Sequence, residues 1–167
     1  LESMPNSITF IGLGIISIEF ASIAVKAGVE THMIHVDDQP LRGFYSAHVE
    51  KLMDKLKEEG VHFHMSENVV AVKENGTNYD VVTQSGLTIQ SDYVLDATGR
   101  MPNVEGIGLE EVGIEYSKFG VKVDEYLRTN VPNIYASGDV IEKMIPKLTP
   151  TATFESNYIA AHILKMN

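Results

Sequence analysis

The sequence predicts an α/β protein with a Rossmann-like parallel sheet, an antiparallel β-meander as a crossover, and an incomplete second domain at its end. Two observations carry this prediction. A glycine-rich turn near the start of the chain joins a short apolar run to a longer one of helical length. Strand and helix patterns then alternate to about residue 64, after which three short β-rich runs follow one another. We therefore expect a parallel sheet with one crossover made of strands.

The first element is a strand, a turn and a helix. Apolar residues from Ile8 to Ile11 lead into Gly12-Leu13-Gly14, and a second apolar run from Ile15 to Val25 has helical length. Glycine backbone lets a pyrophosphate come close, and the free N–H groups and positive dipole end of the helix favour its charge. The third fingerprint position holds Ser17 in place of Gly or Ala, and glycines also make ordinary turns. This motif alone is therefore compatible with two interpretations, a dinucleotide-binding site and an ordinary turn.

The next elements complete a βαβαβ core and then depart from it. Apolar periodicity predicts a strand, a helix and a strand at 31–36, 46–59 and 61–64. Asn75-Gly76 and Ser85-Gly86 are typical hairpin turns, which predicts a meander with strands at 68–73, 79–83 and 87–90. A strand at 93–97 then returns the chain to the parallel sheet.

The remainder, from Met101, has weaker patterns. Short strands are expected at 121–123 and 133–136, and an amphipathic helix at about 151–164. The apolar periodicity is too sparse for an independent core, so we interpret this tail as a piece of a second domain.

Composition excludes several classes of partner and chemistry. The 167 residues hold no cysteine, which excludes a disulfide, a thiol nucleophile or a Cys-ligated metal within them. The net charge of −10 argues against nucleic acid or an anionic membrane surface. No apolar run reaches the roughly 18 residues that a membrane span needs. Leu1 to Met4 look like a cloning remnant and no signal peptide is visible, so we expect a cytoplasmic protein.

Four motifs follow one another along nearly the whole chain. They are G-x-G-x-x-x-x-E at Gly12, Gly14 and Glu19, A-T-G-R-x-P-N at Ala97 to Asn103, T-N-x-x-x-I-Y-A-x-G-D at Thr129 to Asp139, and L-T-P at Leu148 to Pro150. In these motifs the chain resembles the central part of the pyridine nucleotide-disulfide oxidoreductases, the flavoenzyme family of glutathione reductase, lipoamide dehydrogenase and mercuric reductase. The resemblance implies an NAD(P)H-binding Rossmann domain at 5–102 and a partial FAD-binding domain segment at 103–167.

The resemblance also implies what the parent protein does and what these residues lack. Family members are homodimers that pass hydride from NAD(P)H through FAD to a disulfide or a similar acceptor. Their redox-active cysteine pair lies upstream and their catalytic His-Glu pair lies downstream. No catalytic residue is therefore expected here, and the chain alone should be inactive. An oxidase or peroxidase of the same family, and a stand-alone dinucleotide-binding or sensing module, are the alternatives. The flavin-type tail argues against the sensor.

The resemblance assigns cofactor contacts residue by residue. Glu19 would point at the nicotinamide carboxamide, although a solvated helix face is its plain alternative, and Ile15 replaces a tyrosine lid found in some members. Asp139 would accept the ribityl hydroxyls of FAD. The full set is Gly12, Gly14, Ile15, Ile16, Glu19, His35, Val36, Arg42, Val69, Gly99, Arg100, Asp139, Leu148, Thr149 and Pro150.

The choice between NADPH and NADH depends on the end of the second strand. By the resemblance, His35 stands where NADH-linked members have Glu, Val36 stands where NADPH-linked members have their first Arg, and Arg42 matches their second. Asp37 and Asp38 either repel a phosphate or accept the ribose. With the main NADH carboxylate missing and one phosphate partner kept, we expect NADPH to be preferred.

Two further expectations concern metals and assembly. Six histidines are present, and His62 and His64 share one strand face, but no Cys or carboxylate stands beside them at ligand spacing, so no metal site is predicted. The strands at 121–123 and 134–135 should lack their sheet neighbours. We therefore expect either that the tails of two copies pair or that the tail is mobile past about Met101, and we favour pairing.

Overall fold

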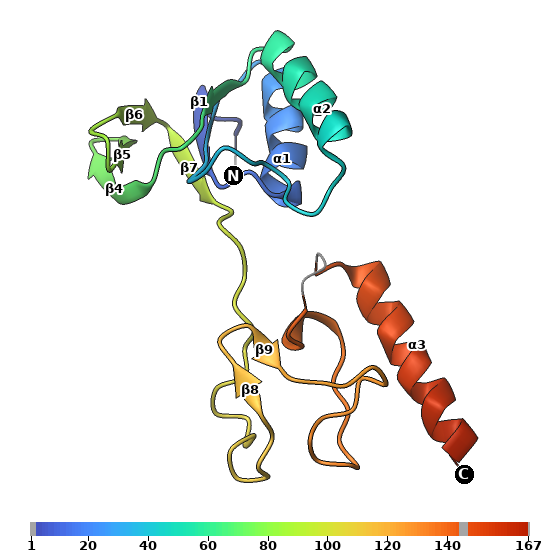
Figure 1. The fold of residues 1–167 in the computed structure, drawn as a ribbon. Helices are drawn as coiled ribbons and strands as arrows, with labels where there is room; N and C mark the ends of the chain where they lie inside the picture. Colours follow the sequence, from blue (N-terminus) through green and yellow to red (C-terminus); the bar gives the residue numbers. More distant parts are fainter. Residues whose placement is uncertain (1–2, 144–146, 167) are drawn as a thin grey trace. The chain divides into compact units, whose positions relative to one another are not determined.

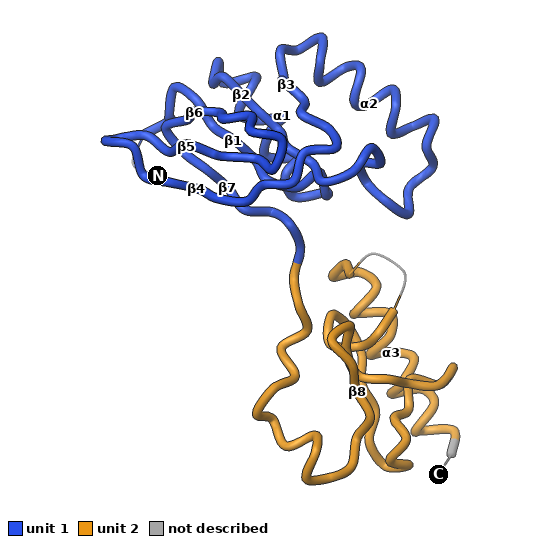
Figure 2. Tube along the Cα trace, turned by 60° about the vertical axis from the view of Figure 1, so that its left-hand side comes forward, with its two compact units in different colours: residues 1–99 blue, residues 100–167 orange. Residues whose placement is uncertain are grey.

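The chain folds into two compact units. The computed structural model describes residues 3–143 and 147–166, and the units comprise residues 1–99 and 100–167 (Figure 2). The predicted boundary between the two domains, at 102–103, lies three residues after the division between these units. Each unit is described by itself below.

Unit 1 (residues 1–99) is built on a four-stranded parallel sheet with the strand order β3-β2-β1-β7 (Figure 1). Its elements are β1 (Ser7–Ile11), α1 (Ile15–Lys26), β2 (Glu30–Ile34), α2 (Ser46–Glu58), β3 (His62–His64) and β7 (Tyr93–Asp96). This is the predicted Rossmann-like sheet, and each boundary lies within two residues of its expected place. The end of β2, at Ile34 in place of the expected Val36, is among the largest differences. Beyond Ile34 the N–H of His35 still donates to the carbonyl of His64 in β3. The carbonyls of His35 and Asp37 instead accept the N–H groups of Glu67 and Ser66, which follow β3.

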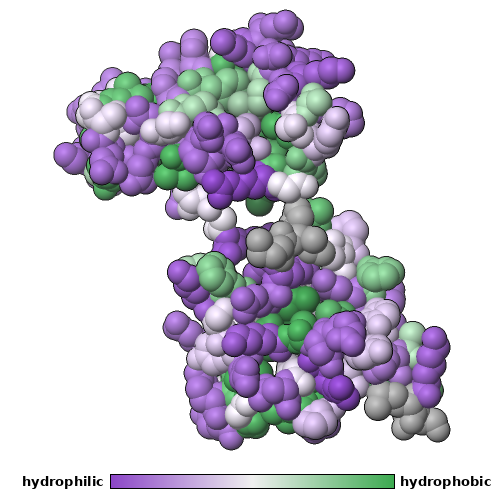
Figure 3. Space-filling view, viewed as in Figure 1, coloured by the Kyte–Doolittle hydropathy of each residue, from purple (hydrophilic) through white to green (hydrophobic). Residues whose placement is uncertain are grey.

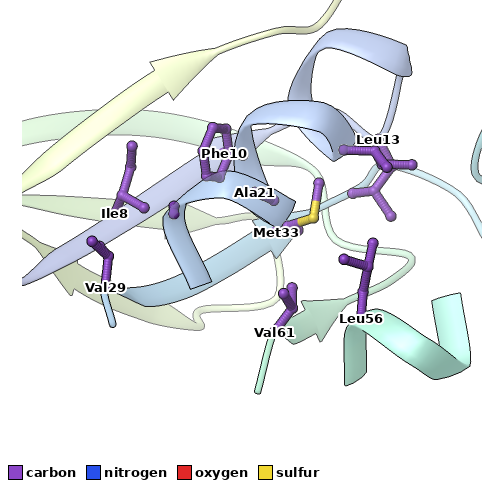
Figure 4. Close-up of a cluster of buried hydrophobic side chains, with 10 residues drawn as sticks. Ile8, Phe10, Leu13, Ala21, Val29, Met33, Leu56 and Val61 are labelled. Carbon is purple, nitrogen blue, oxygen red and sulfur yellow. The ribbon is translucent and has the colours of Figure 1, made fainter. Parts of the chain in front are cut away.

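The main core of unit 1 lies between the sheet and its two helices. Phe10 and Met33 point from neighbouring strands toward Ala21 of α1, and Leu56 of α2 closes the same cluster (Figure 4). All four side chains are almost fully buried. Full burial of one such apolar side chain stabilises a fold by about 1.5–3 kcal/mol, so this layer holds the turn after β1 in place.

The opposite face of the sheet carries the predicted meander. Its strands are β4 (Val69–Asn75), β5 (Asn78–Thr83) and β6 (Thr88–Ser91), which pair antiparallel in that order. Val81 and Ile89 pack against Ile34 of the parallel sheet. The hydroxyls of Thr9 and Ser91, both fully buried, are 2.5 Å apart and satisfy each other between the two layers.

Unit 2 (residues 100–167) corrects two expectations. It contains β8 (Tyr116–Ser117), β9 (Gly120–Val121), the 3₁₀ helix η1 (Gly138–Val140) and α3 (Thr149–Met166). The prediction that it lacks a core of its own was wrong, because Val104, Leu109, Ile114 and Val121 form a buried cluster. Val121 belongs to β9, but Val104, Leu109 and Ile114 lie outside helices and strands and have no regular spacing, so the sequence did not show the cluster.

The expected strands of unit 2 also differ from the observed ones. The predicted strand at 133–136 forms only a single bridge, between Tyr135 and Arg128. The strand at 121–123 was expected to lack sheet neighbours, but Val121 has two. It pairs antiparallel with Tyr116 of β8 and forms a parallel bridge with Ile141. The tail therefore satisfies part of its own backbone.

Candidate dinucleotide site

Gly12 is required by the fold of the turn after β1. Its φ is +96°, and a Cβ at this position would lie 2.6 Å from the carbonyl oxygen of Ala97. The N–H of Gly12 donates to the carbonyl of Ile34 at 2.8 Å. A residue without a side chain is thus needed for the turn to pass between the ends of β2 and β7.

At Gly14, by contrast, neither the backbone conformation nor the packing of the protein requires glycine. It is the N-cap of α1 with a φ of −90°, which any residue adopts, and a Cβ built on it would meet nothing within 4 Å. No side chain caps the helix. The absence of a side chain therefore keeps open the space in front of the first N–H groups of α1, as an approaching pyrophosphate requires.

Ser17 explains the departure from the usual third glycine. Its side chain is fully buried where α1 packs on the sheet, and its hydroxyl donates to the carbonyl of Gly14 at 3.0 Å. A small residue fits this close approach, and the bond back to Gly14 satisfies the buried hydroxyl.

The exposed face of α1 carries Glu19 among apolar neighbours. Ile16 is 49% exposed, Phe20 52% and Ile23 61%. Glu19 is also exposed. Their spacing places these residues on one side of the helix, while Ile15 at its start is half-buried. Among the described residues Glu19 forms no hydrogen bond or ion pair, so its nicotinamide role stays a prediction.

A small cavity at the carboxyl ends of the strands gathers four of the predicted residues. It measures about 130 Å³ and is lined by Gly12, His35, Val36 and Val69, together with Thr98. Ligands of open α/β sheets bind at this edge. Residues from the turn, the end of β2 and the start of the meander thus meet at one place.

His35 ties the glycine turn to the loop after β2. Its Nδ1 accepts the N–H of Leu13 at 3.3 Å, and its Nε2 lies 3.3 Å from the carbonyl oxygen of Gln39 and 3.2 Å from Oδ1 of Asp37. An accepting Nδ1 requires the hydrogen to be on Nε2, which is then the donor. Sequence reasoning compared His35 only with a ribose-binding Glu and missed this bridging role.

Arg42 lies in the same loop but is held by Asp37. Its Nη2 donates to Oδ2 of Asp37 at 2.6 Å, and its side chain is 70% exposed. The N–H of Gln39 is the largest cause that lowers the pKa of Asp37, and His35 and Arg42 lower it further. Arg42 lines a neighbouring groove of about 990 Å³ with Pro40 and other loop residues. The smaller cavity does not include Arg42 in its lining.

In unit 2 the predicted flavin residues lie around the turn at η1. Nη1 of Arg100 is 3.4 Å from Oδ2 of Asp139, and Nζ of Lys147 donates to the backbone carbonyl of Asp139 at 2.7 Å. These three residues line a cavity of about 280 Å³. Gly99, the last residue of unit 1, has a φ of +123°. Leu148 immediately precedes α3, and Thr149 and Pro150 open it, close to the start predicted for the last helix.

Glu155 and Lys143 support this turn, and sequence reasoning missed both. Oε2 of Glu155 accepts the N–H of Gly138 at 2.6 Å, and Nζ of Lys143 lies 2.9 Å from Oε1. Their side chains are 10% and 9% exposed. A carboxylate inside the predicted last helix was the available signal.

In unit 1, His32 of β2 and His62 and His64 of β3 form a cluster of rings. His32 stacks on His62 with ring centroids 4.9 Å apart, and Nδ1 of His32 is 3.2 Å from Nε2 of His64. Burial is the largest cause that lowers the pKa of both His32 and His64. Within 3–143 and 147–166, no three or more His, Asp or Glu side chains are arranged to hold a metal.

Comparison with known proteins places these motifs in a family context. A family model described as pyridine nucleotide-disulphide oxidoreductase matches residues 1–156. The chain is 40% identical over 157 residues to a glutathione reductase of Burkholderia cepacia, covering 93% of this chain and 34% of the relative. It is 36% identical over 168 residues to a dihydrolipoyl dehydrogenase of Bacillus subtilis (strain 168), covering 98% and 35%.

Solved structures agree on the fold. LpdA from Mycobacterium tuberculosis superposes with a TM-score of 0.90 at 26% identity, covering 99% of this chain and 36% of that one. The flavoprotein disulfide reductase RclA from Escherichia coli has a TM-score of 0.86 at 22% identity, covering 98% and 37%. The chain thus spans about a third of the length of the relatives it matches. In the part that the structure describes, no helix is long and apolar enough to cross a membrane.

Proposed function

Because the chain belongs to the pyridine nucleotide-disulphide oxidoreductase family, we propose that unit 1 is the NAD(P)H-binding part of an FAD-dependent oxidoreductase and unit 2 a part of its FAD domain. The parent protein would pass hydride from NAD(P)H through FAD to a disulfide or a similar acceptor. These 167 residues hold no cysteine, so the chain alone lacks the thiols for that last step. We expect it to bind a dinucleotide without turning over a disulfide.

The contrast between Gly12 and Gly14 carries this proposal. The turn itself needs Gly12, whereas nothing inside the fold needs Gly14. A bare N-cap on an uncapped helix is what a pyrophosphate needs in order to reach the first N–H groups. When NAD(P)H is bound, its nicotinamide ring would supply the hydride.

The substitution Gly14→Val tests the proposal. Because the position is open and its φ suits any residue, the variant should fold as the wild type does, with a melting temperature lowered only slightly, since valine is a poorer N-cap than glycine. Its side chain would block the approach to α1, so NADPH and NADH should both bind at least about tenfold more weakly by titration calorimetry. Lys73→Ala on β4, remote from the glycine turn in the sequence, is the control. Unchanged affinity in a folded Gly14→Val protein would refute the site.

We also propose NADPH as the preferred dinucleotide. Arg42 is the cationic partner for its 2′-phosphate, as bidentate or single contacts of arginine to phosphate are strong. The ion pair with Asp37 at 2.6 Å opposes this role, because the phosphate has to compete with the carboxylate for the same guanidinium. The preference over NADH should therefore be modest.

Two copies of the chain are proposed to associate through unit 2. Phe154 and Leu164 on α3 are 70% and 77% exposed, and apolar patches are visible among polar ones on the face drawn in Figure 3. Exposed apolar surface of this kind favours association. Sedimentation of the full chain beside a version cut after Asn103 tests this. A monomeric full chain would contradict it.

A further inference from the structure

Three histidines on one face of the parallel sheet have no role in the proposed function. β3 is the edge strand, and His62 of β3 stands in register with His32 of β2. His64, two residues further along β3, lies on the same face as His62 because side chains alternate along a strand. Met33, between His32 and Ile34, points to the opposite, helix-covered face. The histidines therefore lie on the meander side of the sheet, at its edge.

The ring nitrogens of His32 and His64 have the separation of two metal ligands. Nδ1 of His32 is 3.2 Å from Nε2 of His64. Zinc–nitrogen bonds are about 2.0–2.1 Å, so two imidazoles at the tetrahedral angle place their nitrogens about 3.3 to 3.4 Å apart. His32 and His64 lie on the paired strands β2 and β3, so the distance between their backbones is set by the sheet.

The surroundings of His32 resemble those of a metal-bound imidazole. Its other nitrogen, Nε2, is 3.3 Å from Oε1 of Glu30. Metal ligands commonly donate this second N–H to a carboxylate, which fixes the tautomer and raises the basicity of the ligating nitrogen. The ring is further held by stacking on His62, at a centroid distance of 4.9 Å. In the tautomer that donates from Nε2 to Glu30, Nδ1 of His32 carries no hydrogen, and it lies 3.2 Å from Nε2 of His64.

We propose that His32 and His64 form a two-imidazole site for a divalent transition-metal ion, with water completing the coordination. Zn²⁺ suits the tetrahedral spacing, and imidazole suits zinc, copper and nickel, whereas Mg²⁺ prefers oxygen ligands. A bound ion would link the edge strand β3 to β2 through its bonds to His64 and His32. It would stabilise the native state by mass action.

A hydrogen bond between the two imidazoles is the competing explanation of the same distance. With Nε2 of His32 donating to Glu30, Nδ1 is an acceptor, and a hydrogen on Nε2 of His64 would fill the gap. A metal ion replaces that hydrogen and moves His64 to its other tautomer. The two arrangements therefore differ in whether added metal is taken up at this place.

Titration calorimetry of the full chain with ZnCl₂ separates them. We expect one Zn²⁺ per chain, no binding of Mg²⁺, and at least tenfold weaker Zn²⁺ binding in both His32→Gln and His64→Gln. His48→Gln is the matched control, since His48 is an exposed histidine on α2. Its affinity should equal that of the wild type. The proposal would be overturned if His32→Gln and His64→Gln bound Zn²⁺ as tightly as the wild type does, or if the wild type bound no Zn²⁺.

A second measurement does not depend on the variants folding. In ¹⁵N–¹H spectra of the wild-type imidazoles, Zn²⁺ should shift Nδ1 of His32 and Nε2 of His64, and leave the ring nitrogens of His48 unmoved. Shifts confined to other histidines would show that the ion binds elsewhere, and the assignment would be wrong.

Discussion

Replacing Glu155 by alanine should destabilise unit 2 strongly. The carboxylate is 10% exposed, and it accepts both the N–H of Gly138 and the ammonium of Lys143, which is 9% exposed. Removing it leaves a buried charge without its partner, which costs about 3–5 kcal/mol. The loss equals a large share of the roughly 5–15 kcal/mol by which domains are stable. The turn that presents Asp139 should therefore open long before the rest of the chain.

Hydrogen exchange followed residue by residue in increasing urea measures this effect. In Glu155→Ala, the Gly138 amide should lose most of its protection, while amides of β1 and β2 in unit 1 should keep theirs. Glu155→Gln, which keeps an acceptor for the N–H, should fall between the two. The double variant Glu155→Leu with Lys143→Met should recover much of the loss, because a buried ion pair is often replaceable by apolar side chains.

The refuting result is equally specific. In Glu155→Ala, the free energy of opening at the Gly138 amide could stay within about 0.5 kcal/mol of the wild-type value. The Glu155–Lys143 pair would then contribute no more than an ordinary surface contact. The idea that α3 holds the turn through this carboxylate would then be wrong.

Four further predictions follow from individual contacts. Gly12→Ala should lower the free energy of unfolding by more than about 1 kcal/mol in urea titrations, since φ is +96° and the added Cβ would lie 2.6 Å from a carbonyl oxygen; unchanged stability would show that the turn relaxes. Arg42→Ala should reduce the preference for NADPH over NADH about tenfold by calorimetry, and equal ratios in both proteins would remove Arg42 from the site. Burial lowers the pKa of His32 and His64 below 6.5, so below about pH 6.5 the unfolded chain binds protons that the native state does not, and the native state loses stability as the pH falls. The difference between the urea midpoints at pH 7.5 and 5.5 should therefore be smaller in the double variant His32→Gln with His64→Gln than in the wild type. An identical difference in the two proteins would contradict this. The purified chain should carry no flavin absorbance after gel filtration, and a surviving yellow band would show a more complete flavin site than proposed.

The sequence by itself determined the local elements of this protein. The apolar periods of α1 and α2, the glycines of the first turn and the Asn-Gly and Ser-Gly hairpins depend on residues within a few positions of one another. Their structure was predictable for that reason, as was the succession along the chain of strands in the parallel sheet and strands in the meander. The four motifs also indicated the family, because their residue types and spacing are read directly along the chain.

Tertiary structure alone decided what each residue does in its site. Gly12 and Gly14 look alike in the sequence, but only Ala97, brought beside Gly12 by β7, separates a glycine that the fold needs from one that it leaves open. His35 bridges Leu13 and Gln39 only because β2 ends beside the turn.

The core of unit 2 follows the same rule. Val104, Leu109 and Ile114 lie in irregular segments that have no period to detect, and they pack against Val121 of β9. Glu155 reaches Gly138 across 17 residues. Contacts of this kind arise from burial and chain reversal, which short-range patterns do not encode. They are therefore visible only once the chain is folded.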